Sequence, residues 1–253
     1  MDRLNTAVAT RAQTRVPAAA FAVMTAGVSA ALHLGKLPPA VPALRDALGI
    51  GLVEAGFLLS LVQVAGMTLG LAVGLMADSL GLRRSMLGGL VLVTLASAGG
   101  AFVQPGPHAL ALLLALRALE GVGFLLAVMP GPGLIRALAP PAAEKAAMGL
   151  WGAYMPVGVA LALLAGPPFI ARFAWSGWWG LMAAISAVAA IWVWLIVPVD
   201  ARRTTGKGGA PDWRSRLSQT IGAPGPRLLG LAFAVYSAQW MAVIGFLPAI
   251  YAD

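Results

Sequence analysis

The chain has 253 residues, of which 60% are hydrophobic and only 10% are charged, and its mean hydropathy is +0.86. An ordinary soluble domain carries about 25% charged residues, so the composition excludes a water-soluble enzyme or binding module and indicates a protein that folds in a lipid bilayer. The formal net charge is +8 and cysteine is absent, which excludes disulfides, thiol nucleophiles and thiolate metal sites.

Seven apolar blocks follow one another along the chain, and each is long enough to cross about 30 Å of hydrocarbon as a helix. None shows the alternating polarity of a membrane barrel strand, so we predict an all-α integral membrane fold. The first block is too long for a signal-peptide core and no small-residue cleavage site follows it, so we expect it to be retained. The predicted spans are residues 16–41, 52–76, 85–104, 108–130, 146–169, 177–197 and 227–250.

Basic residues mark one side of these predicted spans. When the loops alternate across a membrane, thirteen Lys and Arg residues fall on the side of the N-terminus, and only Arg45 and Arg172 fall on the other. This asymmetry follows the positive-inside rule and predicts a cytoplasmic N-terminus. It also accounts for the basic net charge without a nucleic-acid partner.

Polar side chains interrupt the first predicted span. Four of them fall within an arc of about 80° on one helix face, and these are Thr25, Ser29, His33 and Lys36. A lysine that faces lipid inside the bilayer is costly, so we expect this stripe to face a bundle interior or a watery cavity, and we take the cavity as the prediction. Two alternatives stay open, because Lys36 can snorkel to the outer headgroups and His33 can form an interhelical hydrogen bond. One histidine with no carboxylate nearby does not predict a metal site.

A short loop with two glycines and opposite charges joins the second and third predicted spans. Gly74 and Gly81 allow the close approach and the positive φ that a tight reversal needs. Asp78, Arg83 and Arg84 place opposite charges at the membrane interface, where they can pair and cap helix ends. Taken by itself, this pattern is also typical of an ordinary positively charged loop.

The fourth predicted span contains both an arginine and a glutamate. Arg117 and Glu120 are three residues apart, the spacing at which side chains meet on a helix, so we predict an intramembrane ion pair. Two roles stay open: helix packing, or an anion site in which Glu120 takes a proton when Arg117 engages the solute. Together with Lys36, Arg117 would make the cavity positive and select a small organic or inorganic anion. The secondary cavity candidates are Gln63, Tyr154, Tyr236, Gln239 and Trp240.

The longest polar stretch, residues 198–226, is rich in glycine, proline and basic residues, and this composition is typical of a linker. Residues 213–221 can form a short helix on the lipid surface, with Trp213, Leu217 and Ile221 on one side. A solvated loop is the alternative for this segment.

The loop between the second and third spans resembles the signature of the major facilitator superfamily of transporters, GxLADRxGRRxxL. It reads "GLMADSLGLRRSML" over residues 74–87, with Ser79 and Leu82 in place of two basic residues. The resemblance implies a cytoplasmic gate at this loop, made by Gly74, Asp78, Gly81, Arg83 and Arg84.

Other stretches resemble the same superfamily. Residues 112–123, "LLLALRALEGVG", resemble the fourth-span pattern LxxxRxxQGxG, with Glu120 where glutamine is usual, and residues 175–186 resemble the start of the sixth span. The stretches "GKLPPAVPALRDALGI" and "EAGFLLSLVQ" are most similar to the cyanate and nitroimidazole permease group. The resemblance implies a multi-pass transporter of the bacterial cytoplasmic membrane, with no enzyme activity and no cofactor.

In this superfamily, two six-helix halves move a small solute by alternating access, in some members with H+ as the coupling ion. The resemblance therefore predicts an N-terminal six-helix bundle over residues 1–197 and a basic cytoplasmic linker over residues 198–226. Residues 227–253 would be the first helix of an incomplete C-terminal half. Such a truncated twelve-helix fold predicts little or no transport by this chain alone, unless a second copy or another chain completes the bundle.

A non-transporting seven-helix sensor or assembly protein is the alternative function. A retinal-binding sensor requires a lysine in its last span, and residues 228–250 contain none. The sequence also lacks the HExxH and nucleophile-elbow motifs that would indicate a membrane enzyme. An assembly role stays open.

Overall fold

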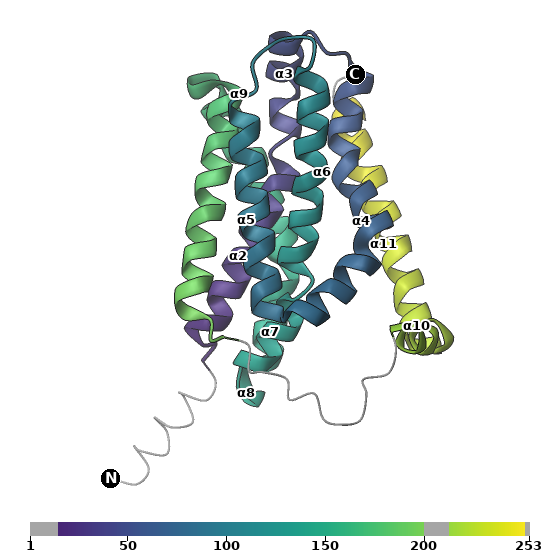
Figure 1. The fold of residues 1–253 in the computed structure, drawn as a ribbon. Helices are drawn as coiled ribbons and strands as arrows, with labels where there is room; N and C mark the ends of the chain where they lie inside the picture. The colour runs from purple at the N-terminus through teal and green to yellow at the C-terminus, as the bar shows by residue number, and fades with distance from the viewer. Residues whose placement is uncertain (1–14, 200–212, 251–253) are drawn as a thin grey trace. The chain divides into compact units, whose positions relative to one another are not determined.

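The computed structural model describes residues 15–199 and 213–250, and every regular element in this part of the chain is helical. The prediction of an all-α membrane fold is confirmed. The chain divides into two compact units, Met1–Ala201 and Arg202–Asp253. Figure 1 shows the elements, which are α2 (Ala18–Gly35), the short 3-10 helix η1 (Pro38–Ala40), α3 (Val41–Leu48), α4 (Leu52–Leu80), α5 (Leu82–Ala101), α6 (Ala109–Val128), α7 (Gly131–Leu138), α8 (Pro141–Gly152), α9 (Tyr154–Ile196), α10 (Trp213–Gly222) and α11 (Pro224–Ile250).

Five helical stretches of the described residues are long and apolar enough, by length and composition, to cross a membrane. They are Ala18–Leu48, Leu52–Gly70, Leu82–Ala101, Ala109–Leu138 and Pro141–Ile196. The last of these has 56 residues and covers both the fifth and the sixth predicted spans. Its helix α9 bends at Ala174, where φ is 57° and ψ is 176°, so two helices meet at that residue.

The first predicted span is not one continuous helix. Helix α2 ends at Gly35, and the chain then passes through η1 into α3. Proline lacks a backbone N–H and its ring clashes with the preceding turn, so Pro38, Pro39 and Pro42 prevent an unbroken helix here. Lys36 is the residue that follows the end of α2, and its backbone N–H donates to the carbonyl of Leu32.

Small residues bring the helices of the first unit close together. A Cβ added at Gly158 of α9 would lie 2.5 Å from the Cβ of Ala31 in α2, and one added at Gly123 of α6 would lie 2.9 Å from the carbonyl oxygen of Gly89 in α5. Such contacts are typical of membrane helices, which gain stability from close packing rather than from hydrophobic burial. Helix α2 therefore packs against α9, and α5 packs against α6 (Figure 1).

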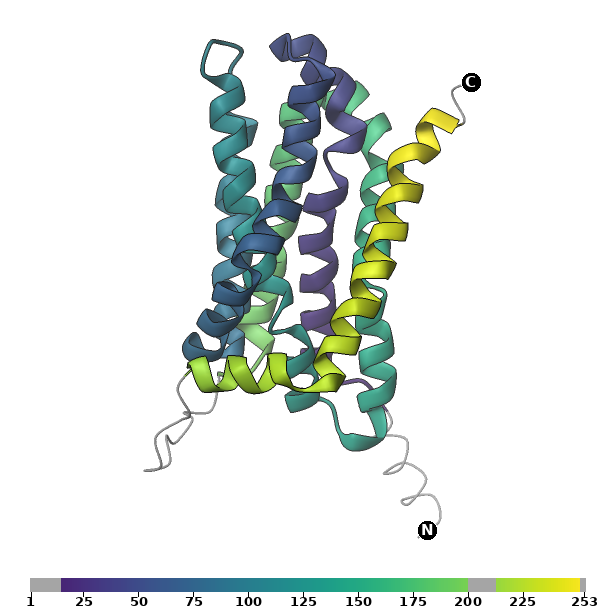
Figure 2. The same ribbon diagram turned by 90° about the vertical axis from the view of Figure 1, so that its right-hand side faces the viewer.

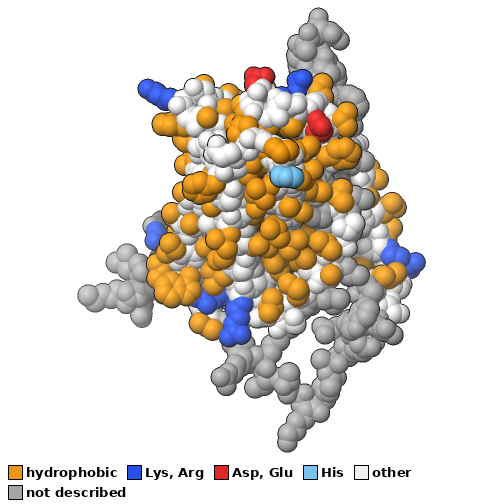
Figure 3. All heavy atoms as spheres, turned by 45° about the horizontal axis from the view of Figure 1, so that its top comes forward, with side chains coloured by type: hydrophobic (Ala, Val, Ile, Leu, Met, Phe, Trp, Pro, Cys, Tyr) orange, Lys and Arg blue, Asp and Glu red, His pale blue; other side chains and the backbone are white. Residues whose placement is uncertain are grey.

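The outer wall of the helices is apolar. Leu95, Leu164, Val188 and Trp194 expose more than half of their surface, and Figure 3 shows that hydrophobic side chains cover the middle of the face in view. An extended apolar exterior is unfavourable in water and favourable in lipid. This surface agrees with the composition and with a multi-pass membrane protein.

The second unit contains α10 and α11. Figure 2 shows α10 running across one end of α11. Pro224 begins α11, and the guanidinium of Arg227 donates to the carbonyls of Gly222 and Ala223 at the corner between the two helices. The short helix expected over residues 213–221 is present as α10.

Candidate functional site

Charged side chains are buried together inside the first unit. Lys36 follows α2, and Arg117 and Glu120 lie on α6, yet they expose only 0%, 3% and 2% of their surface. Lysine, arginine and glutamate are almost never this buried unless they are paired. We call these three residues, together with their neighbours His33 and Ser97, the ion cluster.

Glu120 lies between the two cations of the ion cluster. Its Oε2 is 2.7 Å from Nη1 of Arg117, so the predicted contact along α6 is present. Its Oε1 accepts a hydrogen bond from the ammonium group of Lys36. The same oxygen is 3.8 Å from Nδ1 of His33. One carboxylate therefore bridges a cation from its own helix and a cation from the broken first span.

Three acceptors surround the ammonium group of Lys36. Besides Glu120, Nζ lies 2.9 Å from Oγ of Ser97 on α5 and 3.5 Å from Nδ1 of His33. It also lies 4.5 Å from the ring centroid of Trp179, within range of a cation–π contact. Since an ammonium group has three N–H donors and no acceptor, this arrangement suits a charged lysine.

The neighbouring hydroxyl groups determine which nitrogen of His33 carries a proton. The hydroxyl of Ser186 donates to the carbonyl of Met182 at 2.9 Å, so its oxygen accepts the hydrogen bond from Nε2 of His33 at 2.6 Å. A neutral His33 then presents the lone pair of Nδ1 to Lys36. The hydroxyl of Ser29 also lies 3.5 Å from Oγ of Ser186. The interhelical hydrogen bond that was left open for His33 is therefore present.

Arg117 joins three helices. Its Nη1 donates to the carbonyl of His33 in the last turn of α2 at 2.6 Å, and its Nε donates to the carbonyl of Leu58 in α4 at 3.2 Å. Carbonyls in the last turn of a helix have no partner within that helix, so a cation there satisfies an acceptor and the helix dipole together. Nε1 of Trp178 likewise donates to the carbonyl of Lys36 at 3.0 Å.

The ion cluster contains two cations and one carboxylate. Among residues 15–199 and 213–250, no second carboxylate forms an ion pair with Lys36 or Arg117. With His33 neutral, the ion cluster carries a formal charge of about +1 in a desolvated position, where an uncompensated charge is unfavourable. The ion cluster is therefore one anion short of neutrality.

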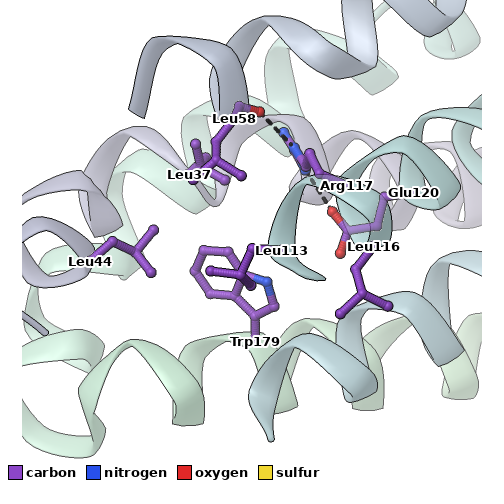
Figure 4. Close-up of a pocket in the computed structure, with 8 residues that line it drawn as sticks. All are labelled: Leu37, Leu44, Leu58, Leu113, Leu116, Arg117, Glu120 and Trp179. Carbon is purple, nitrogen blue, oxygen red and sulfur yellow. Dashed lines mark hydrogen bonds and ion pairs between the residues drawn. The ribbon is translucent and has the colours of Figure 1, made fainter. Parts of the chain in front are cut away.

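A small cavity adjoins the ion cluster on the side of α3. Figure 4 shows Arg117 between the carbonyl of Leu58 and the carboxylate of Glu120, with Trp179 nearby. The cavity has a volume of about 10 Å³, which is room for roughly one water molecule. Its other lining residues are Leu37, Leu44, Leu113 and Leu116. In this conformation the charged groups contact neighbouring helices and not an open solute cavity.

A larger groove lies between α2 and the α8–α9 junction. Its volume is about 280 Å³ and its lining is mostly apolar. Thr25 borders it and donates to the carbonyl of Phe21, whereas Ser29, His33 and Lys36 point into the bundle. Tyr154 borders it too, with its ring stacked on Trp151 at 4.5 Å between centroids. The predicted polar stripe therefore divides between this groove and the buried interior.

The remaining secondary candidates are Gln63 on α4 and three residues of α11 in the second unit. Gln63 is exposed on α4, and Tyr236 and Gln239 are exposed on α11. The side chain of Trp240 lies outside the described residues. A role of these four residues in a solute cavity stays a prediction.

Gly81 alone forms the turn between α4 and α5, and its φ of 95° has the sign that the loop was expected to require. Arg83 is buried, and its Nη2 donates to the carbonyl of Trp194 in the last turn of α9 at 2.6 Å. Arg84 is exposed, and the side chain of Asp78 lies outside the described residues. The expected pairing of Asp78 with the arginines stays a prediction, and Gly74 in α4 is half-buried.

Sequence reasoning missed four residues that belong to the ion cluster or contact it. Ser97 and Ser186 are single hydroxyls in apolar helices, and Trp178 and Trp179 belong to the "WSGWW" stretch at the start of the second part of α9. A serine inside an apolar span was the available signal, because polar side chains at such positions tend to hydrogen-bond across helices. Nothing in the sequence indicated that Ser97 contacts Lys36, 61 residues away, or that Ser186 contacts His33, 153 residues away.

A family model described as Major Facilitator Superfamily matches residues 19–253. No curated protein matches the sequence. The matched range covers both compact units, and the motifs over residues 74–87 and 112–123 lie inside it. The resemblance to the cyanate and nitroimidazole permease group stays a prediction. The chain belongs to the major facilitator superfamily of membrane transporters.

Proposed function

We propose that the protein is a secondary active transporter that moves a small anionic solute across a bacterial cytoplasmic membrane by alternating access, with the ion cluster as its charge centre. The observation that carries this proposal is the composition of the ion cluster. Lys36 and Arg117 are buried with only Glu120 between them. Because buried charges are stable only when they are balanced, a net positive centre favours an anionic solute over a neutral or cationic one.

The distribution of basic residues supports a cytoplasmic N-terminus. Helices α7 and α8 lie at the end of the first unit opposite α3 (Figure 1). Arg136 belongs to α7 and Lys145 to α8, whereas Arg45 belongs to α3. By the positive-inside rule, this distribution favours a cytoplasmic location for the α7–α8 end. H+ is the candidate coupling ion, since an anion that moves inward against a negative membrane potential needs a second, downhill ion.

Uptake by the full chain in proteoliposomes tests the proposal. We expect saturable uptake of small labelled anions, with formate, nitrate and thiocyanate as probes, and no saturable uptake of methylammonium. Lys36→Met should lower anion uptake at least about tenfold, the effect of losing roughly 1.4 kcal/mol of binding. Lys145→Met is the matched control, because Lys145 is exposed on α8.

Two results would contradict the proposal. Saturable methylammonium uptake would show that the site selects cations. If Lys36→Met leaves anion uptake as intact as Lys145→Met does, the ion cluster does not recognise the solute. If a pH gradient does not drive anion accumulation in an otherwise active preparation, H+ is not the coupling ion. That result would leave the rest of the proposal standing.

A further inference from the structure

We propose that the space which the Glu120 carboxylate bridges, between Nζ of Lys36 and Nη1 of Arg117, is a binding position for a monovalent planar oxyanion such as a carboxylate. We call this space the anion seat. When a solute anion binds, it replaces Glu120 as the charged partner of Lys36. Glu120 then pairs with Arg117 alone. This inference rests on the proposed function, because it names the class of anion and the atoms that receive it.

The first argument is charge. With Glu120 alone, the ion cluster holds two cations and one carboxylate. One additional monovalent anion brings the formal charge to zero, with each cation paired to one anion. A divalent anion would leave an excess negative charge in the same desolvated position, which is unfavourable by the same reasoning. The charge count therefore favours a monovalent solute.

The second argument is geometry. The two oxygens of Glu120 engage different cations: Oε2 is 2.7 Å from Nη1 of Arg117, and Oε1 contacts Nζ of Lys36. Glu120 can keep Arg117 without Lys36, because the two residues are neighbours three positions apart on α6. Lys36 is then left with Ser97 and His33, both of them neutral acceptors. An oxyanion restores the charged acceptor that Lys36 has lost.

The third argument is space. The small cavity of Figure 4 touches both Arg117 and Glu120, and its other side chains are leucines and Trp179. In the present conformation it holds roughly one water molecule. Leu44 of α3 and Leu113 and Leu116 of α6 line this cavity. A displacement of those side chains would enlarge the cavity next to the carboxylate, which makes this cavity the route by which a solute anion reaches the seat.

Chemical rescue tests the anion seat in the full chain. Glu120→Ala removes a methylene and a carboxylate, the atoms of an acetate ion, and leaves Lys36 and Arg117 without an anion. We expect its Tm in detergent to lie well below that of the wild type and to rise saturably toward it as acetate or formate is added, since a ligand that binds only the folded state stabilises it. Chloride at the same ionic strength should restore little, because a spherical ion cannot offer two separated oxygens.

Glu120→Gln is the matched control for the rescue. It removes the charge but keeps the volume of the side chain, so acetate has less space than in Glu120→Ala, and we expect a weaker rescue at the same acetate concentration. Equal rescue by acetate and chloride, or equal rescue of both variants, would mean a general salt effect and would overturn the anion seat.

A second measurement covers the case in which Glu120→Ala does not fold. In the wild type, formate should raise Tm saturably, Lys36→Met should lose that rise, and Lys145→Met should keep it. Absence of any formate effect on the wild type would overturn the seat. If anion uptake succeeds while these tests fail, the seat is wrong and the transport proposal stands. If the tests succeed while uptake fails, the seat stands and the transport proposal is wrong.

Discussion

Neutralising Glu120 is the most direct test of the charge balance in the ion cluster. Glu120→Gln keeps the shape of the side chain but leaves Lys36 and Arg117, 0% and 3% exposed, without a carboxylate. Removing one partner of a buried ion pair costs about 3–5 kcal/mol, because the remaining charge is left uncompensated. Here two charges are left, so we expect a loss of free energy of unfolding in the upper part of that range.

Lys36→Met should be milder, although it removes the same ion pair. The Arg117–Glu120 pair at 2.7 Å survives, and the formal charge of the ion cluster falls to zero. The variant loses the hydrogen bond to Ser97, about 0.5–1.5 kcal/mol, and the contact with Trp179, about 0.5–2 kcal/mol. The expected total is about 1–3.5 kcal/mol, so Glu120→Gln should exceed Lys36→Met by roughly 2 kcal/mol.

The assay is equilibrium unfolding in mixed micelles, with far-ultraviolet circular dichroism as the readout and Lys145→Met as the surface reference. In the double variant, removing Lys36 also relieves the repulsion that Glu120→Gln creates. Its loss of stability should therefore be smaller than the sum of the two single losses. A Lys36→Met variant as unstable as Glu120→Gln, or two effects that simply add, would refute the idea that the ion cluster has an excess cation.

Three further variants test the backbone and the turn between α4 and α5, each by Tm in detergent. Gly81→Ala forces a side chain onto a residue with φ of 95° and ψ of 148°, so it should lower stability by about 1–3 kcal/mol; an unchanged Tm would argue against that turn. Ala174→Gly should raise Tm, because alanine at φ 57° is strained and glycine is not; a fall would contradict the bend. Arg83→Gln should lower Tm through loss of the bond to the carbonyl of Trp194, whereas Arg84→Gln at an exposed position should change it little; equal effects would remove Arg83 from that role.

The sequence alone was sufficient for the fold class and the membrane location, because runs of apolar residues determine which segments become helices in lipid. It also placed Arg117 and Glu120 in contact, since their spacing along one helix does not depend on the rest of the chain. The turn at Gly81 was predictable for the same local reason.

The sequence could not show what the polar stripe of the first span faces. Ser29, His33 and Lys36 share a face by helical periodicity, but their partners come from helices distant in the chain. Close packing at small residues determines which helices meet, and a composition rich in alanine and glycine offers many equivalent contacts. The pairing of Lys36 with Glu120 was therefore visible only in the folded chain.

The break in the first span explains the positions of Lys36 and Arg117. It does not explain why the ion cluster holds two cations and only one carboxylate. Lys36 directly follows the end of α2, and Arg117 donates to the carbonyl of His33 in its last turn, so the guanidinium lies at the negative end of the helix dipole. That end is equivalent to about half a negative charge. Adding it to the carboxylate of Glu120 still leaves roughly half a positive charge uncompensated in a buried position. A bundle selected for stability alone would replace one cation with an apolar side chain, as buried ion pairs are often replaced without loss. The excess positive charge of the ion cluster is what a binding site needs if the balancing negative charge is to come from an anion that binds and leaves.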